Sequence, residues 1–126
     1  MTDRCSERIG THQRLRTSLD YAAVKRDARA LRGKHCLLLA AEAPGLPTRV
    51  GFIASRKGVG GAVQRNRARR RLREIVRRRW PLVTPLGLAL VFIANRTSVT
   101  AEHSELVADV ERLLVSAGAI PEGSPA

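Results

Sequence analysis

The chain is poor in the residues from which disulfides and metal sites are built. Only two of its 126 residues are cysteines, Cys5 and Cys36, and its three histidines, His12, His35 and His103, stand far apart in the sequence. One cysteine falls in a polar N-terminal stretch and the other in an apolar run, so the sequence predicts neither a disulfide framework nor a metal cage. No HxxE or CxxC spacing supports a metal site, and we expect the protein alone to bind no metal or cofactor.

Long apolar runs are missing as well. No stretch approaches the roughly 20 residues that a membrane-spanning helix needs, and the N-terminal MTDRCSERIG lacks the apolar core of a signal peptide. Together with the scarcity of cysteine, this predicts a cytoplasmic protein with no membrane partner.

Acidic residues are also scarce, which disfavours a nuclease that cuts RNA with its own carboxylates. Between Glu42 and Glu102 the only carboxylate is Glu74. The acidic residues near the C-terminus are expected to form a solvated face of a terminal helix: Glu102, Glu105, Asp109 and Glu111.

Positive charge is what the chain has in excess. Its 23 basic residues, of which only three are lysines, face 11 acidic residues, giving a formal net charge of +12 and a pI near 11.5. This balance predicts a polyanionic partner, because neutralising phosphates releases condensed counterions. Arginine grips phosphate with two parallel hydrogen bonds, although genome composition could also raise its number.

The size and composition fit a single domain with flexible ends. A chain of 126 residues that is 44% apolar can bury one modest core. The polar residues 1–14 and the Pro-, Gly- and Ser-bearing residues 118–126 are predicted to be flexible tails around a domain of residues 15–117.

Apolar periodicity, helix formers and turn residues predict the order of the elements. They are a helix from Leu19 to about Ala30 capped by Ser18, a strand Lys34 to Ala41, a turn Ala43 to Pro47, a strand Thr48 to Ser55, a glycine loop at 58–61, a helix Ala62 to Trp80, a strand Leu86 to Ala94 and a helix from about Ala101 to Ser116. We expect Thr100 to cap the last helix and Gly118 to end it.

This order indicates a two-layer α+β domain, α-β-β-α-β-α, in which helices cover one face of a small sheet and the other face stays open. The strand at 48–55 is expected to pair with the strand at 34–41. Val50, Phe52 and Ala54 should share one face, because side chains alternate along a strand.

The segment QRNRARRRLREIVRRRW is the strongest feature of the sequence. Residues 65–79 include nine arginines and one acid, Glu74. On a helical wheel one side is apolar and the other cationic. The apolar side holds Ala68, Leu72, Ile75 and Val76, and the cationic side holds Asn66, Arg67, Arg70, Arg73 and Arg77.

This cationic face is more typical of a phosphate-binding surface than of an ordinary solvent-exposed one. Glu74 can pair with Arg70 or Arg78 at i,i+4 spacing, and the other arginines have no acidic partner within the helix. Ordinary solvated faces mix charges of both signs. A helix that lies on a membrane surface is a further alternative, which the surrounding strands disfavour.

RVGFIASRK, the glycine loop and GAVQRNRARRRLRE together resemble the most distinctive stretch of the bacterial ribonuclease P protein family. In that family a Gly-Phe strand leads through a Val-Gly loop into an Arg-Asn-Arg helix that closes with Leu-Arg-Glu, here at Glu74. LDYAAVKR, HCLLL and LALVFIA follow the family's order too, so the resemblance covers roughly residues 15–115. It implies a left-handed β-α-β crossover, which periodicity cannot show.

The resemblance implies two RNA-binding sites. The catalytic RNA would dock on the arginine helix through Arg65, Asn66, Arg67, Arg69, Arg70 and Arg73. The single-stranded 5′ leader of a precursor tRNA would lie in a cleft between the first helix and the open sheet face, held by stacking and charge. Its residues would be Tyr21, Lys25, Phe52, Arg56 and Lys57.

Three departures from the family pattern concern the leader site. Lys25 replaces a second aromatic residue, Cys36 replaces the aromatic residue after the strand histidine, and the loop near Gly58 is one residue longer. We expect poorer stacking and hypothesise that the charge of Lys25 compensates for it. Phe52 fits ordinary core equally well, and Tyr21 fits helix packing. If a Lys25→Ala variant kept the relative affinity for precursors with and without a leader, the compensation hypothesis would be wrong.

The implied function is that of a protein subunit that joins the ribonuclease P RNA in a 1:1 complex and promotes 5′-leader removal from precursor tRNA. The RNA and the Mg²⁺ that it requires would carry out the cleavage, and no residue of this chain is expected to be catalytic. A ribosomal or RNA-chaperone protein of similar fold fits the charge and size equally well. A stand-alone nuclease is a second alternative, which would have to cleave without an RNA partner.

Overall fold

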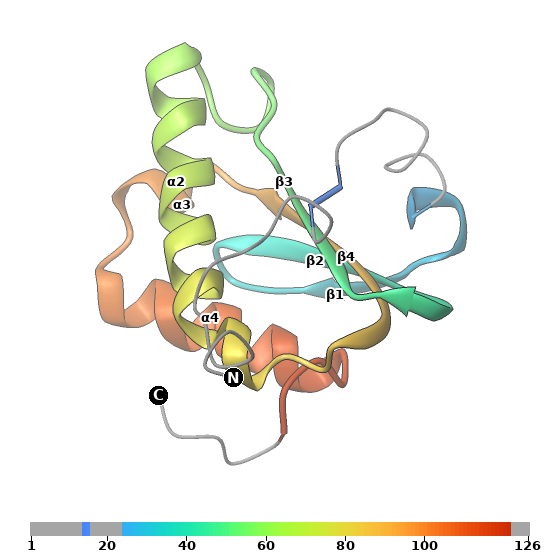
Figure 1. The fold of residues 1–126 in the computed structure, drawn as a ribbon. Coiled ribbons are helices and arrows are strands. Elements are labelled where there is room, and N and C mark those ends of the chain that lie inside the picture. Colours follow the sequence, from blue (N-terminus) through green and yellow to red (C-terminus); the bar gives the residue numbers. More distant parts are fainter. Residues whose placement is uncertain (1–13, 16–23, 122–126) are drawn as a thin grey trace.

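The computed structural model describes residues 14–15 and 24–121 and has the expected α+β architecture (Figure 1). Its strands are β1 (Arg29–Arg32), β2 (Cys36–Pro47), β3 (Arg49–Ile53) and β4 (Leu86–Ala94). Its helices are α2 (Ala62–Arg79), α3 (Thr97–Thr100) and α4 (His103–Ser116), with a 3₁₀ turn, η3 (Trp80–Leu82), after α2. Residues 24–27 are also helical. The predicted arginine helix and the predicted strand before α3 are confirmed.

The four strands form one sheet in the order β1-β2-β4-β3. β4 lies between β2, which is antiparallel to it, and β3, which is parallel to it. Parallel neighbours cannot be joined by a tight turn, so the chain crosses from β3 to β4 through α2 in the expected β-α-β unit. The left hand of this crossover stays a prediction.

The predicted pairing of the strand at 48–55 with the strand at 34–41 is wrong, because β4 is inserted between β2 and β3. Leu90, Val91 and Phe92 are consecutive in β4 and all fully buried. Consecutive side chains point to opposite faces, so only a central strand that is covered on both faces can bury all three.

The N-terminal edge of the sheet also differs from the prediction. The sequence predicts a helix to about Ala30, but residues 29–32 form β1, in which Ala30 pairs with Leu39. Pairing with β2 outweighs the helix propensity of Arg and Ala, because tertiary contacts override local preference. The predicted turn at 43–47 belongs to β2, whose register with β4 shifts there. The predicted cap Ser18 lies outside the described residues.

The last helix is preceded by the separate single turn α3. Thr100 is the last residue of α3, so its predicted role as the cap of α4 is wrong. The N-cap of α4 is Glu102, which forms no side-chain capping hydrogen bond. The chain therefore turns twice between β4 and α4, and this places α3 against α2.

Gly118 ends α4 as predicted, with a φ of +78° that residues with a Cβ atom rarely adopt. The amide of Ala119 donates to the carbonyl of Leu114 at 2.9 Å, which closes the last turn. Ala119 and Ile120 are buried in the core. The domain thus continues through Ile120, and the predicted start of a flexible tail at residue 118 is wrong.

Apolar clusters lie on both faces of the sheet. The larger one joins β2, β3 and β4 to the inner sides of α2 and α4, which lie together on this side in Figure 1. Val50 and Ala54 belong to it and Phe52 packs against it, so their predicted common face is confirmed. The smaller cluster is formed by Leu15, Val24, Ala41, Ala89 and Val91. The second face is therefore partly covered.

No helix of the described part of the chain is long and apolar enough to cross a bilayer.

Candidate nucleic-acid interface

The arginine-rich helix α2 is positioned by its apolar side. That side is buried in the larger cluster as predicted, through Ala68, Leu72, Ile75 and Val76. The first turn of α2 holds no acidic residue, and Arg77, Arg78 and Arg79 occupy its last turn. Cations are favourable there because the helix dipole is negative at its C-terminus. Burial of one side therefore presents the other arginines to solvent, except Arg79, which is itself buried.

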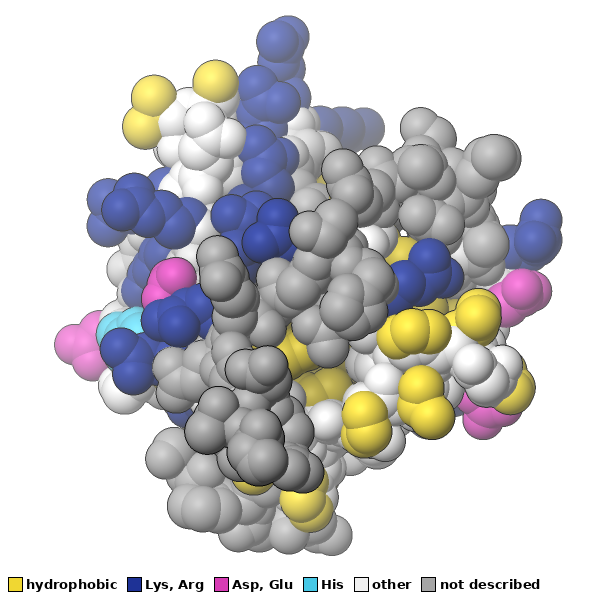
Figure 2. Space-filling model, viewed as in Figure 1, with side chains coloured by type: hydrophobic (Ala, Val, Ile, Leu, Met, Phe, Trp, Pro, Cys, Tyr) yellow, Lys and Arg dark blue, Asp and Glu magenta, His cyan; other side chains and the backbone are white. Residues whose placement is uncertain are grey.

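Lys and Arg side chains gather along α2 in Figure 2, with a histidine side chain beside them. Because the apolar side faces the sheet, the polar side chains leave the helix on two flanks. The β3 flank, directed toward the end of β3, consists of Asn66, Arg69 and Arg73. The α4 flank, directed toward α3 and α4, consists of Arg67, Arg70, Arg71 and Arg78. The residues predicted to bind the catalytic RNA are therefore divided between two surfaces.

On the β3 flank, Arg69 is held by two contacts. Its Nη2 donates to Oδ1 of Asn66 at 2.6 Å, and its Nη1 lies 3.4 Å from the carbonyl oxygen of Ala54. The Nε of Arg65, at the start of the helix, is buried without a hydrogen-bond partner among the described residues. Arg69 thereby orients Asn66, and Arg65 keeps a donor for which an external acceptor would be favourable.

Phe52 joins the two predicted RNA sites. Its ring stacks on that of Phe92 at 5.8 Å between centroids and 13° between planes. The guanidinium carbon of Arg73 lies 5.9 Å from the Phe52 centroid, within the range of a cation-π contact. Phe52 is only partly buried, so its ring belongs to the core and also borders the arginine surface.

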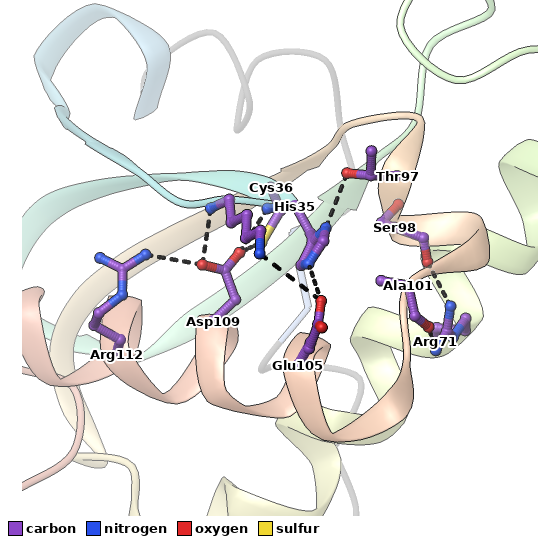
Figure 3. Close-up of polar contacts among 10 residues, drawn as sticks. His35, Cys36, Arg71, Thr97, Ser98, Ala101, Glu105, Asp109 and Arg112 are labelled. Atoms are coloured by element: carbon purple, nitrogen blue, oxygen red, sulfur yellow. Dashed lines mark hydrogen bonds and ion pairs between the residues drawn. The ribbon is translucent and has the colours of Figure 1, made fainter.

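On the α4 flank, Arg71 acts on the protein itself. Its Nη1 donates to the carbonyls of Ser98 (2.9 Å) and Val99 (3.0 Å), and its Nη2 donates to that of Ala101 (2.6 Å) (Figure 3). Burial, and next the charge of Arg67, lower the pKa of Arg71. Carbonyls at a helix end lack partners within the helix, so Arg71 satisfies the end of α3 and fastens it to α2.

Glu74 is paired, but not as predicted. Its carboxylate accepts hydrogen bonds from Arg77, the shortest being 2.9 Å, rather than from Arg70 or Arg78. Residues three apart are also neighbours on a helix surface, which makes Arg77 an equally near partner. The hydrogen bond from Arg77 holds the pKa of Glu74 below its usual value, and the charges of Arg78 and Arg70 add to this.

The acidic residues of α4 are not all solvated as predicted. Glu111 accepts a 2.7 Å hydrogen bond from Nε of Arg79, whose Nη1 also donates to the carbonyl of Ile75. Arg79 is buried, so this pair joins α2 to α4 inside the molecule. Asp109 is buried as well, whereas Glu102 and Glu105 are exposed as predicted.

Asp109 fastens the turn between β1 and β2 to α4 (Figure 3). One carboxylate oxygen accepts the amide of Lys34 and a hydrogen bond from Arg112, and the other accepts the amide of His35, each at 2.8 Å. Burial acts to raise the pKa of Asp109, but the two amides and Arg112 outweigh it, and the pKa lies below its usual value.

Cys36 and His35 are part of the same buried region. Burial, and next the charge of Asp109, raise the pKa of the Cys36 thiol to about 12. A fully buried, protonated thiol can neither stack on a base nor act as a nucleophile. His35 Nδ1 is 2.9 Å from the hydroxyl of Thr97, and its Nε2 is 3.5 Å from the carboxylate of Glu105. Both residues are structural.

The described residues among those predicted for leader binding do not all lie on one face of the sheet. Lys25 is exposed on the helical residues 24–27, which pack on the sheet face opposite α2 through Val24. Phe52 points to the α2 side, and Arg56 and Lys57 are exposed in the turn after β3. Tyr21 lies outside the described residues. Phe52, Arg56 and Lys57 are thus close to the β3 flank, whereas Lys25 is separated from Phe52 by the sheet.

Residues 14–15 and 24–121 contain no group of three or more His, Cys, Asp or Glu side chains that could hold a metal ion.

The contacts of Arg71 and Arg79 could not be predicted from the sequence, because their partners lie on α3 and α4. The only sequence signal for them is that both residues fall toward the apolar side of the helical wheel.

A family model described as Ribonuclease P matches residues 9–118 of the chain. The ribonuclease P protein component of Symbiobacterium thermophilum is 41% identical over 106 residues, which cover 83% of this chain and 90% of that protein. The corresponding protein of Roseiflexus castenholzii is 44% identical over 109 residues, covering 85% of this chain and 87% of that protein. These relatives thus match over nearly their whole length.

Solved structures agree in fold. The ribonuclease P protein of Staphylococcus aureus matches with a TM-score of 0.74 at 18% identity, over 86% of this chain and 97% of that chain. The Thermotoga maritima ribonuclease P protein matches with a TM-score of 0.69 at 24% identity, over 80% of this chain and 94% of that chain. At these identities the likeness concerns the fold alone.

Proposed function

Because this chain belongs to the bacterial ribonuclease P protein family, we propose that the arginine surface of α2 binds the catalytic RNA of that enzyme. The chain is a protein subunit of the ribonuclease P ribonucleoprotein, which acts in tRNA processing. Beyond this family membership, we propose which RNA binds to each surface and that the partner RNA carries out the cleavage. The 1:1 assembly with RNA and its cytoplasmic location are parts of the same proposal.

The observation that carries the proposal is the surplus of unpaired cations on α2. Within the described residues, neither Arg70, Arg73 nor Arg78 has a carboxylate partner, and the only acid of the helix, Glu74, is bonded to Arg77. In the free protein these neighbouring positive charges repel one another, whereas RNA phosphates would neutralise them. Arg65, Asn66 and Arg69 continue the surface toward β3 and add directed hydrogen-bond donors.

The cleavage chemistry is assigned to the partner RNA, which supplies it together with Mg²⁺. On the protein, α2 offers guanidinium donors and no free carboxylate, since Glu74 is engaged by Arg77. Arginine cannot act as a general base at neutral pH because it stays protonated. The role proposed for this chain is therefore to hold and orient RNA.

The 5′ leader of the precursor tRNA is proposed to contact the β3 flank. Phe52 supplies a partly exposed aromatic ring, and the guanidinium of Arg73 lies over this ring. Aromatic rings and cations are the groups with which proteins stack and neutralise single-stranded RNA. Arg56 and Lys57 are exposed after β3 and extend the basic surface. Lys25 lies on the other sheet face, so its contribution to leader binding stays a prediction.

Precursor-tRNA cleavage at low Mg²⁺ tests the proposal. A bacterial ribonuclease P RNA is incubated with a leader-bearing precursor, with and without this protein, beside a reaction that contains the protein alone. We expect the protein to rescue cleavage by the RNA and to cleave nothing by itself. RNA binding without rescue would favour a chaperone, and cleavage by the protein alone would contradict the assignment of the chemistry to RNA.

A further inference from the structure

We propose that the groove between α2 and the first turns of α4 is a second RNA site, separate from the β3 flank, and that it holds the phosphate backbone of the catalytic RNA. The inference rests on the proposed function, because it concerns the same RNA partner. It adds His103 to the RNA-binding residues and assigns the groove to the catalytic RNA alone, whereas the β3 flank is proposed to contact both the catalytic RNA and the leader.

The groove consists of two adjoining hollows of about 440 Å³ and 340 Å³. Glu74 and His103 line both of them, so the hollows meet at these two side chains. One hollow extends past Arg78 toward the last turn of α2, and the other extends past Arg70 toward its middle. Two neighbouring open hollows along one side of a helix can each take a phosphate of the same sugar-phosphate backbone, which a single closed pocket cannot.

The groove is lined mainly by cations. Arg67, Arg70 and Arg71 line one hollow, Arg78 and the paired Arg79 line the other beside Ile75 and Val107, and the imidazole of His103 borders both. In the part of the chain that the structure describes, no carboxylate pairs with Arg70 or Arg78. Arg71 is held in place by three carbonyls, so its charge is already fixed before a ligand arrives. Free guanidinium groups around a fixed one suit the bidentate recognition of phosphate.

The one carboxylate in the groove is largely neutralised. Glu74 would repel a phosphate if its charge were free, but it accepts three hydrogen bonds from Arg77. These bonds draw the carboxylate toward Arg77, which does not line either hollow. Glu74 thus lowers the positive charge of the groove but does not make the groove negative. Removing the charge of Glu74 should therefore strengthen phosphate binding.

The lining also distinguishes the groove from the leader surface. None of the described residues that border the two hollows is Phe, Tyr or Trp. Single-stranded RNA is held largely by stacking on aromatic rings, which the β3 flank offers at Phe52. A cationic groove without aromatic rings is suited instead to binding the phosphate backbone of a folded RNA. The groove is therefore assigned to the catalytic RNA and not to the leader.

The test compares an Arg78→Ala/His103→Ala double variant with Arg32→Ala, which removes a charge from the exposed edge strand β1. Affinity for a bacterial ribonuclease P RNA is measured first in the absence of precursor tRNA. We expect the double variant to bind about 10-fold more weakly and Arg32→Ala to change affinity less than about 2-fold. In the assembled holoenzyme, the preference for leader-bearing over leader-less precursor should stay unchanged in the double variant.

Glu74→Gln gives a test of opposite sign, which does not depend on a loss of function. The exposed carboxylate becomes a neutral amide, and affinity for the catalytic RNA should rise about 3-fold. Unchanged or weaker binding would contradict the groove assignment, as would a double variant that binds like Arg32→Ala. A double variant that keeps its affinity but loses leader preference would assign the groove to the leader.

An Arg69→Ala/Arg73→Ala variant separates failure of this inference from failure of the proposed function. If it weakens RNA binding while the groove variants do not, the groove assignment alone is overturned. If neither pair of substitutions alters RNA binding, α2 is not the RNA-binding surface and both proposals fail.

Discussion

At the scale of single residues, Asp109 determines how the turn between β1 and β2 sits on the helical layer. Each of its oxygens accepts one backbone amide, from Lys34 and from His35. The turn can come this close because residue 33 is a glycine: a Cβ atom there would lie 2.6 Å from Oδ2 of Asp109 and from the carbonyl oxygen of Cys36. A carboxylate on α4 and a glycine in the turn therefore depend on one another.

Asp109→Asn is expected to destabilise the fold by about 2 kcal/mol at neutral pH, because the new NH₂ group would face one of the two amide donors. The pKa of Asp109 is lowered by folding, so its ionised form stabilises the protein at neutral pH. That stabilisation is lost as the pH falls through the lowered pKa, below the usual aspartate range. Urea denaturation between neutral and acid pH measures both effects.

Glu42→Gln on the exposed part of β2 is the matched control and should change the free energy of unfolding at neutral pH by less than about 0.5 kcal/mol. An Asp109→Asn variant that kept the pH dependence of the unaltered protein would show that Asp109 does not contribute to acid unfolding.

Arg70 and Arg71 are neighbours in sequence with different expected roles. Arg71→Ala leaves three carbonyls at the end of α3 without their donor and should lower the free energy of unfolding by about 1–3 kcal/mol. Arg70→Ala removes an exposed side chain and should change it by less than about 0.5 kcal/mol. Equal losses in urea titrations of the two variants would contradict this division between structural and RNA-binding arginines.

At the scale of elements, the end of α4 depends on the backbone conformation of one residue. Gly118 donates to the carbonyl of Val115 at 3.0 Å while Ala119 donates to that of Leu114 at 2.9 Å, and this pattern needs a positive φ at Gly118. The following residues, Ala119 and Ile120, are thereby directed into the core.

Gly118→Ala should cost about 1 kcal/mol, since nothing lies near the added Cβ and the loss comes from the strained φ alone. Gly118→Asn should cost less, because asparagine tolerates this conformation better. Thermal unfolding of the two variants measures the difference, and an alanine variant as stable as the unaltered protein would show that the last turn can close in another way.

The sequence predicts the elements with strong periodicity best. The limits of α2, β4 and the end of α4 follow from apolar spacing, Pro81 and Gly118. The neighbour of β3 and the existence of β1 could not be predicted, because both are decided by pairing with strands distant in sequence. Local preference alone favours a helix that continues to about Ala30 and a hairpin between β2 and β3.

The candidate site could likewise be predicted only as far as it depends on spacing within one helix. The spacing of the arginines separates a buried side of α2 from a cationic one, and this separation is confirmed. Which arginines are engaged inside the protein depends on Glu111 and on the carbonyls of α3, and these meet α2 only in the folded molecule. The division of the cationic side into two flanks follows from the same tertiary contacts.

At the scale of the whole molecule, part of the excess positive charge lies on α2, on arginines that pair with no carboxylate of the described residues. Arg71 and Arg79 hold α3 and α4 against α2, while the arginines beside them remain available on both flanks. The larger core buries the apolar side of α2 and leaves its cationic side exposed. The fold thus presents the cationic side of a helix to solvent, and this is what a backbone-binding RNA subunit requires.

The most direct test of this account is the salt dependence of affinity for a bacterial ribonuclease P RNA. The unaltered protein is compared with an Arg70→Ala/Arg73→Ala variant, which removes one available arginine from each flank. We predict that log affinity falls steeply with log salt concentration and that the variant's slope is shallower by about 2, since two phosphate contacts are lost. Identical slopes would contradict the claim that the arginine surface of α2 binds the catalytic RNA.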